Sequence, residues 1–364
     1  MTKRVVVLGG SHSCIVAVKE IAKIDRTAQI TVISPSTHFF FNVSAPKAFV
    51  DPKYPSQLFF PLKSIFAKEI EQSQVTLVQG KAVRTDFQGS HLMYASQGKE
   101  SIQEYDVLVL ATGARAESQA FKVENNHNDT IKAIEEIAAK AKTAKQIVVA
   151  GGGATGVETV SQLKEKYPSA KVILYTGSEG PLKHLNKIDV ATKKLSSLGV
   201  KVVNQIKVTS NETVSDGRIR LFLSNGETQI VDVYVPAVGL YPNSGYIDSA
   251  YLDKDGYVVT DNTLVVKGTE NVIAVGDIAS GTTNTIATLQ FVHKPVLTST
   301  LRHLLTGSKI TKTLKVPTGA SQFVPIGSKG GVGVLFGWPV PSFLVAQLKG
   351  KDFMLGQAKK DYSA

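Results

Sequence analysis

Short apolar runs, each followed by a glycine turn and a helical stretch, recur along the chain. Arg4–Leu8 is rich in β-branched residues, Gly9 and Gly10 follow it, and a helical stretch reaches about Lys23. A second apolar run covers Gln29–Ile33. Strands that alternate with helices predict βαβ units and a parallel sheet.

The same unit returns in the middle of the chain. Gln146–Ala150 is an apolar run, three glycines follow it, a helical stretch reaches about Lys166, and Lys171–Tyr175 is the next strand. The glycine turns begin at residues 9 and 151, and this separation indicates two nucleotide-binding domains rather than two halves of one sheet. From about residue 313 the chain is richer in Gly and Val, which predicts strands and a small terminal domain.

The second glycine turn matches G-x-G-x-x-G in a strand–turn–helix context. Gly151 permits the tight turn, Gly153 lets backbone approach a pyrophosphate, and Gly156 lets the helix pack closely on the strand. The amino end of the following helix offers N–H groups to phosphates. The alternative is a turn that only packs. The residues predicted to bind NAD(P)H are Gly151, Gly153, Ala154, Thr155, Gly156, Glu158, Thr176 and Gly239.

The strand after this turn ends without the acid that would hold the adenosine ribose diol. It ends Leu174-Tyr175-Thr176-Gly177, and Lys183 and His184 follow. Without a carboxylate to repel a 2′-phosphate, NADPH should be accepted at least as well as NADH. The alternative is that Lys183 and His184 are simply solvated.

The first glycine turn keeps only Gly9 of the three expected glycines. Ser11 occupies the close-approach position and Cys14 the helix-packing position, and both are small enough for the geometry to survive. The next strand again lacks a ribose acid, but Ser34 can offer one hydrogen bond. We interpret Cys14 as a buried, inert residue at a helix–strand contact.

The composition of the chain limits its domain number and excludes several kinds of active site. The 364 residues are 43% hydrophobic and 20% charged, which indicates a folded protein of about two domains and a small third. Cys14 is the only cysteine, so an internal disulfide, a CxxC pair and a cysteine-based metal cluster are excluded. No H-E-x-x-H spacing and no Ser–His–Asp order stands out. With neither a targeting signal nor a 20-residue apolar span, we expect a cytoplasmic protein, at most peripheral on a membrane or mitochondrion-associated.

Three further segments carry a family resemblance. Tyr105–Ala114 is an apolar strand that ends in Ala-Thr-Gly, Asp232–Asn243 ends in Gly-x-x-Pro-Asn, and Thr269–Asp277 ends in Gly-Asp. Their order resembles the pyridine nucleotide-disulfide oxidoreductase superfamily. The resemblance implies an α/β fold with two Rossmann-type domains, the second inserted into the first, and a small C-terminal α+β domain. The implied boundaries are 1–115 and 244–312 for FAD, 116–243 for NAD(P)H, and 313–364 for the C-terminal domain.

Two stretches narrow the resemblance. His38–Lys47 and Gly330–Phe353 are similar to the apoptosis-inducing-factor-like group, which includes ferroptosis-suppressor-type flavoproteins and fungal relatives. The implied cofactors are FAD and NADH or NADPH. The FAD-binding residues so implied are Gly9, Gly10, Ser11, Ser34, Pro46, Lys47, Val83, Ala111, Thr112, Gly113 and Asp277.

The resemblance places catalysis on the flavin. Asp277 is expected to accept bonds from the ribityl hydroxyls, unless it only caps the next helix. Lys47 is expected near the pyrophosphate or the reduced ring, unless it is a surface lysine. Gln290, Phe291 and His293 are candidates for the quinone side, unless they are structural. Arg84 and Asp86 are weaker candidates for the flavin site. The catalytic candidates are Lys47, Gln290 and His293.

The single cysteine also limits the acceptor. Disulfide reductases of this fold pass electrons to a cysteine pair, which this chain lacks. Electrons would therefore pass directly to a quinone, a dye-like acceptor or oxygen.

Charge raises two further hypotheses. The net charge is +11, and +6 of it lies between Gly307 and Ala364, beside an apolar stretch that holds Phe336, Trp338, Phe343 and Leu344. Such a surface suits peripheral attachment to an anionic membrane, with ordinary packing as the alternative. The competing function is an apoptosis-inducing-factor-like signalling or DNA-binding flavoprotein, although no DNA-binding module is evident.

Overall fold

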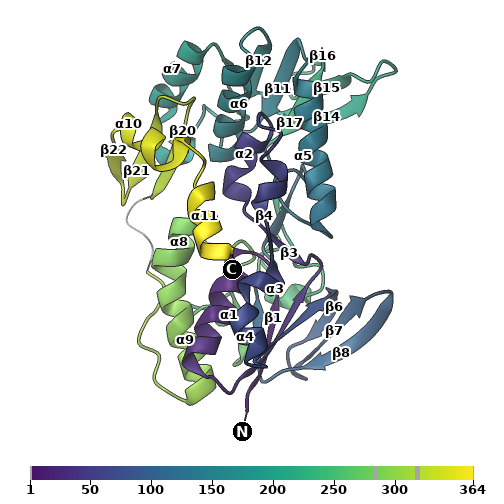
Figure 1. Cartoon of the computed structure of the whole chain (residues 1–364), viewed down its shortest axis with the longest axis vertical. Coiled ribbons are helices and arrows are strands. Elements are labelled where there is room, and N and C mark those ends of the chain that lie inside the picture. Colours follow the sequence, from purple (N-terminus) through teal and green to yellow (C-terminus); the bar gives the residue numbers. More distant parts are fainter. Residues whose placement is uncertain (1, 282–284, 316–319, 364) are drawn as a thin grey trace.

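A computed structural model describes residues 2–281, 285–315 and 320–363 (Figure 1). Its first sheet is parallel, with the strand order β19-β9-β1-β2-β5. The bounds are β1 Arg4–Leu8, β2 Gln29–Ser34, β5 Val75–Gln79, β9 Val107–Leu110 and β19 Val272–Ala274. The predicted βαβ start is confirmed, and helix α1 spans His12–Ile24.

The two faces of this sheet are covered differently. Val5 and Val7 of β1 pack toward the main core, whereas Val6 and Leu8 pack into a second cluster. This alternation is the two-residue period of a strand that is buried on both sides. Helix α1 packs against α9 (Lys294–Thr306). The second cluster takes up side chains of an antiparallel sheet of β6 Lys81–Asp86, β7 His91–Ser96 and β8 Lys99–Glu104.

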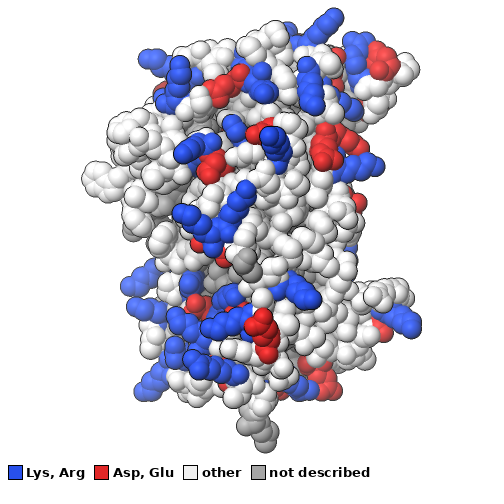
Figure 2. All heavy atoms as spheres, viewed as in Figure 1, with Lys and Arg blue, Asp and Glu red and all other residues white. Residues whose placement is uncertain are grey.

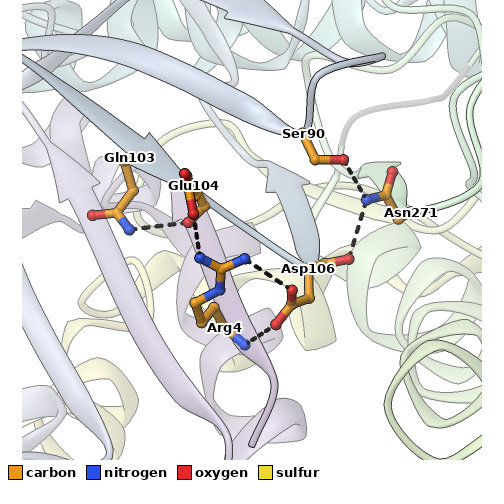
Figure 3. A network of polar contacts seen from close by, with 6 residues as sticks. All are labelled: Arg4, Ser90, Gln103, Glu104, Asp106 and Asn271. Carbon is orange, nitrogen blue, oxygen red and sulfur yellow. Dashed lines mark hydrogen bonds and ion pairs between the residues drawn. The ribbon is translucent and has the colours of Figure 1, made fainter. Parts of the chain in front are cut away.

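A polar network closes the amino end of the first sheet. Figure 3 shows the Arg4 guanidinium between Glu104 and Asp106, at N–O distances of 2.6 and 3.2 Å. Asn271 donates to the backbone oxygen of Asp106 and to Ser90. These contacts tie the β7–β8 hairpin to the start of β1. The opposite, carboxyl end of the sheet is where parallel α/β folds bind ligands.

The second parallel sheet repeats this arrangement, with the strand order β13-β12-β11-β17. Its predicted strands are confirmed, with β11 at Gln146–Ala150 and β12 at Lys171–Tyr175. The remaining strands are β13 Lys201–Val203 and β17 Val233–Pro236. Helix α6 (Ala154–Lys166) packs on one side. On the other side lies an antiparallel sheet of β14 Val208–Thr213, β15 Ile219–Leu223 and β16 Thr228–Val231. The mixed α/β fold with Rossmann-type sheets is thus confirmed.

Two antiparallel strands mark where the chain passes between the parallel sheets. β10 (Ala114–Ala116) leaves the first sheet region and pairs with β18 (Leu240–Pro242) on the way back. Helix α5 (His127–Ala141) follows β10, and α7 (Ile188–Leu198) follows β12. The segment between β10 and β18, which contains the second parallel sheet, therefore leaves and re-enters the region of the first sheet at this one pair of strands.

The C-terminal segment forms a small antiparallel sheet with helices beside it. The strands are β20 Gln322–Pro325, β21 Gly331–Leu335 and β22 Trp338–Val340. Helix α10 (Ser342–Val345), a π-helix at Ala346–Gly350 and α11 (Leu355–Tyr362) follow. In the part of the chain that the structure describes, no helix has the length and hydropathy needed to cross a membrane.

This segment contacts both parallel-sheet regions. Ser44 donates to the backbone oxygen of Phe353 at 2.8 Å, on the side of the first sheet. Ser328 donates to Glu165 of α6 at 2.6 Å, on the side of the second. Tyr362, the last residue of α11, packs edge-on against Phe39. The C-terminal segment therefore bridges the two halves of the molecule.

Candidate functional site

A cavity of about 670 Å³ opens at the carboxyl end of the first sheet. Segments far apart in the sequence line it, because the ends of β1, β2, β9 and β19 meet there. The sequence-predicted residues that the structure brings to this cavity are Gly9, Gly10, Ser11, Ser34, Val83, Ala111, Thr112, Gly113, Asp277 and His293. Pro46, Lys47 and Gln290 are not among its lining residues.

Gly9 makes the close approach that this cavity requires. Its φ of +122° is a backbone conformation that residues with a side chain rarely adopt. A Cβ on Gly9 would also lie 2.3 Å from the backbone oxygen of Ala111. A Cβ on Gly10 would lie 2.5 Å from the hydroxyl of Ser34. The turn therefore exposes bare backbone to the cavity and brings β1, β2 and β9 together around it.

Cys14 lies behind the turn and plays no part in the cavity. The thiol is fully buried, and burial raises the pKa of Cys14 to about 12. A thiol with such a pKa stays protonated and unreactive at neutral pH. The prediction of a buried residue at the helix–strand contact is confirmed.

An ion pair crosses the cavity wall. Nζ of Lys122 lies 2.7 Å from a carboxylate oxygen of Asp277, and both side chains are about a quarter exposed. Asp277 follows β19, whereas Lys122 lies in the irregular segment between β10 and α5. Sequence analysis did not single out Lys122, because no local motif surrounds it and its partner is 155 residues away. The pair places a cation and a hydrogen-bond acceptor side by side in the cavity.

Two histidines also line the cavity, the half-buried His12 and the buried His293, and each has a buried ring nitrogen without a partner: Nε2 of His12 and Nδ1 of His293. Burial, and then the charge of Lys122, lowers the pKa of His12 to about 4. Burial also lowers the pKa of His293. Both rings are therefore neutral at pH 7. His12 was the residue that sequence analysis passed over, although it is the first residue of α1.

This cavity fits a flavin dinucleotide. Bare backbone at Gly9 and Gly10 and the amino end of α1 suit a pyrophosphate, and Lys122 supplies a cation. Asp277 and the orphaned ring nitrogens suit hydroxyls and polar ring atoms, since buried polar groups seek partners. No group of three or more potential metal ligands occurs among the described residues.

Of the remaining flavin-side candidates, Lys47, Phe291, Arg84 and Asp86 are not among the residues that line the cavity. Lys47 is half-buried on α2 (Ala45–Ala48), which packs against α6. Leu289 and His293 of the π-helix Leu289–His293 line the cavity, while Phe291 of the same helix is two-thirds exposed. Arg84 and Asp86 lie within β6, where both side chains are exposed.

The second glycine turn lies beside a smaller pocket of about 420 Å³. Gly151 repeats the geometry of Gly9, since its φ is +125° and a Cβ would lie 2.3 Å from the backbone oxygen of Ala237. The pocket is lined by Gly152, Gly153, Thr176, Ser178, Gly180, Lys183, His184 and Asn186. Gly151, Ala154, Thr155, Gly156, Glu158 and Gly239 of the predicted set are not among these residues.

An ion pair lies in the loop that borders this pocket. Glu179, which sequence analysis did not consider, lies 2.6 Å from Nζ of Lys183. The hydrogen bond from Lys183 lowers the pKa of Glu179, so the carboxylate is charged at neutral pH. The strand end itself carries no acid, but Glu179 in the following loop adds a carboxylate next to Lys183. His184 is also engaged, because its Nε2 lies 2.8 Å from Gln322 of β20.

Glu158 lies on the buried side of α6 and pairs with the C-terminal segment. Its carboxylate is 2.6 Å from Nζ of Lys349, and the two side chains are 4% and 13% exposed. Burial raises the pKa of Glu158, and the Lys349 charge opposes that shift. Lys349 also donates to the backbone oxygen of Phe323. This partner is 191 residues away, so the sequence pattern offered no signal for it.

Comparison with known proteins gives this geometry a context. Residues 3–294 match the family model described as pyridine nucleotide-disulphide oxidoreductase. The chain belongs to this family. The flavin-type NAD(P)H oxidoreductase character expected from the motifs is thereby confirmed at family level.

Two curated relatives cover nearly the whole chain. Oxidoreductase ptaL of Pestalotiopsis fici is 31% identical over 359 residues, which are 95% of each chain. Ferroptosis suppressor protein 1 of Xenopus tropicalis is 28% identical over 373 residues, which are 98% of this chain and 95% of that one. The predicted resemblance to ferroptosis-suppressor-type proteins and fungal relatives is confirmed.

Solved structures share the fold. The water-forming NADH oxidase of Lactobacillus brevis, solved with NADH, superimposes with a TM-score of 0.67 over 86% of this chain and 71% of that one, at 17% identity. A ferredoxin reductase of Rhodopseudomonas palustris gives a TM-score of 0.65 at 20% identity, over 86% of this chain and 78% of that one.

Proposed function

We propose that the protein passes a hydride from NAD(P)H to bound FAD and then electrons directly to a quinone-like acceptor or oxygen. The observation that carries this proposal is the cavity at the first glycine turn, which combines bare backbone, Lys122 and Asp277 with two neutral histidines that have unpaired, buried ring nitrogens. The relative oxidoreductase ptaL and the structural neighbour that is a water-forming NADH oxidase are both named for oxidoreductase chemistry, which supports the proposal. Cys14 is the only cysteine and is buried, which supports an exit without a redox disulfide.

Each part of the cavity has a distinct task in this proposal. When bound, FAD supplies a carrier that accepts two electrons as hydride and releases them to an acceptor. The amide groups of the Gly9–Ser11 turn and the Lys122 ammonium hold the pyrophosphate. Asp277 orients a ribityl hydroxyl. His12 is neutral, so it offers a hydrogen bond without adding a charge whose strength changes near pH 7.

The nicotinamide nucleotide is assigned to the second turn. Gly152 and Gly153 border the pocket beside that turn, and Thr176 and Lys183 form its far side. We propose that both NADH and NADPH bind, because Lys183 favours a 2′-phosphate while Glu179 disfavours it. Lys47, Gln290 and His293 remain the proposed candidates for the flavin–acceptor region.

The experiment is anaerobic reduction of the purified protein. Its yellow flavin should be bleached by NADH and by NADPH, then reoxidised by a short-chain quinone, oxygen or ferricyanide. Asp277→Asn should lower the bound FAD content. Asp216→Asn, which changes an exposed, ion-paired aspartate in the turn between β14 and β15, should not. A colourless protein that shifts DNA at physiological salt would contradict the proposal and favour the signalling or DNA-binding alternative.

A further inference from the structure

The C-terminal segment exposes a group of large apolar side chains that no described element covers. Trp338 is 77% exposed, Phe336 63% and Phe343 60%. The other exposed members of this group are Leu335, Leu348 and Met354. Scattered apolar side chains on a surface are ordinary, but six within one small segment indicate an interaction surface.

The hairpin formed by β21 and β22 presents two of these residues, Phe336 and Trp338, at its tip. Phe336 and Gly337 both have positive φ, at +49° and +83°, which is the turn that normally selects Asn-Gly. A bulky aromatic residue in this conformation costs stability. Because the Phe336 ring is also exposed, that cost brings no compensating burial within the chain. The tip therefore presents an aromatic ring at a net cost to the fold.

The inner side of the hairpin is fixed by close packing. A Cβ on Gly331 or Gly333 would lie 2.6 Å from a methyl group of Val345 on α10. The amide of Phe336 donates to the Ser321 hydroxyl at 2.9 Å. The hairpin is thus held in place by its packing against α10 and by the hydrogen bond to Ser321. The exposed rings at the tip extend from this packed part of the segment.

The charges around this surface favour an anionic partner. Residues 330–348 contain no charged side chain, and Figure 2 shows the edge over β21 and β22, at the left, free of charge. The exposed Lys329, Lys351 and Lys360 flank the stretch, and none of them forms an ion pair with a described carboxylate. From residue 320 onward the sequence holds five lysines and two aspartates.

We propose that the β21–β22 tip docks on an anionic membrane surface, with Phe336 and Trp338 inserted at the headgroup level. The indole of Trp338, with its polar N–H, favours that region, the Phe336 ring adds apolar insertion, and the lysines gain from anionic headgroups. A second copy of the chain is a weaker fit, because it would bring two lysine-flanked surfaces together. This inference concerns where the protein acts and goes beyond the proposed reaction.

Trp338 is the only tryptophan, so its fluorescence reports on the tip alone. The flavin-loaded protein is mixed with phosphatidylcholine vesicles, with and without phosphatidylserine. We expect a blue shift of Trp338 emission and co-sedimentation with the phosphatidylserine vesicles. Phe336→Asn should weaken binding about tenfold through lost apolar insertion, and it should not lower the urea midpoint, because Asn suits a positive φ.

A matched variant tests whether vesicle binding requires this surface or only any exposed apolar side chain. Ile102 of β8 is 64% exposed, nearly the same as Phe336, but lies on the antiparallel sheet beside the first domain. Ile102→Asn should leave vesicle binding unchanged. Lys351→Gln should weaken binding about fivefold with phosphatidylserine and not at all with phosphatidylcholine alone.

Three results would overturn the membrane assignment. They are an emission unchanged by vesicles, equal effects of Phe336→Asn and Ile102→Asn, or a blue shift that grows with protein concentration without vesicles, which would indicate self-association. Because vesicle binding is measured without substrate, these results leave the anaerobic flavin reduction as an independent test of the reaction.

Discussion

The two glycine turns are built alike but enclose very different spaces. Gly9 and Gly151 have nearly the same φ and the same 2.3 Å approach to a backbone oxygen. The first turn has lost two of its three motif glycines, yet it borders the larger cavity. The difference teaches that the motif reports local backbone geometry, whereas the enclosed space depends on distant segments such as the one that carries Lys122.

A second difference is how each helix is tied to the rest of the molecule. Seven residues after Gly151 the helix carries Glu158, which is paired with Lys349, and seven residues after Gly9 it carries Val16 in an apolar core. The second turn therefore depends on the C-terminal segment for a charge partner. The predictions below test these differences, from the largest effect to the smallest.

Lys349→Met should produce the largest loss of stability. It leaves the Glu158 carboxylate buried without a partner, which costs about 3–5 kcal/mol in the free energy of unfolding. Burial already raises the pKa of Glu158, and loss of Lys349 raises it further. The destabilisation should therefore shrink as pH falls through that raised pKa, since protonation removes the charge.

Urea unfolding of the flavin-loaded protein at several pH values measures this effect. Lys351→Met, at an exposed site two residues away, is the control and should change stability by less than about 0.5 kcal/mol. Glu158→Gln combined with Lys349→Met should recover most of the loss. Equal losses for the two lysine variants would show that the ion pair does not support the second turn.

The acid stability of the first turn should depend on His12. Its pKa is about 4 in the folded protein and about 6.5 when unfolded, so the unfolded chain binds more protons as pH falls. The contribution of neutral His12 to the free energy of unfolding is complete above the unfolded pKa. It is lost as pH falls from about 6.5 to 4, by roughly 3 kcal/mol. His12→Phe should flatten that slope in urea unfolding measured across the range. A slope that the variant leaves unchanged would assign the acid sensitivity to other groups.

Substitutions at the third motif position should cost unequal amounts of stability in the two turns. A Cβ on Gly156 would lie 1.9 Å from the backbone oxygen of Gly151, so Gly156→Ala should cost about 2 kcal/mol and weaken NADH binding. The first turn already accommodates a side chain at this position, so Cys14→Ala should cost only about 1 kcal/mol. Thermal unfolding and an NADH titration measure both. If Cys14→Ala proved the more damaging change, the comparison of the turns would be reversed.

The smallest expected effect concerns nucleotide preference at the second pocket. Glu179→Gln removes a carboxylate beside Lys183 and should raise the kcat/KM ratio of NADPH to NADH roughly threefold. Glu212→Gln is the matched control, because Glu212 is also exposed and paired with a basic residue, Arg220. An unchanged ratio at low salt would place Glu179 too far from the 2′ position to matter.

The repeated strand–turn–helix units were predictable from sequence because their signals are local. An apolar run followed by glycines places Gln146–Ala150 and its turn without any tertiary information. Lys122 and Lys349 were not predictable, because each acquires its role only from a partner more than 150 residues away. Glu179 was within reach, since it stands four residues from Lys183, the spacing of a surface ion pair.

The bridging position of the C-terminal segment has a consequence for synthesis. The ring centroids of Tyr362 and His12 lie 6.4 Å apart, so the wall behind the first cavity is completed by a segment translated long after the first sheet. Domains generally fold as they emerge, amino-terminal first. The nascent region of the first sheet must therefore wait with Phe39 and its neighbours uncovered until α11 has emerged. A stop codon placed just before α11 should yield chains that are recognised by chaperones rather than released as mature protein.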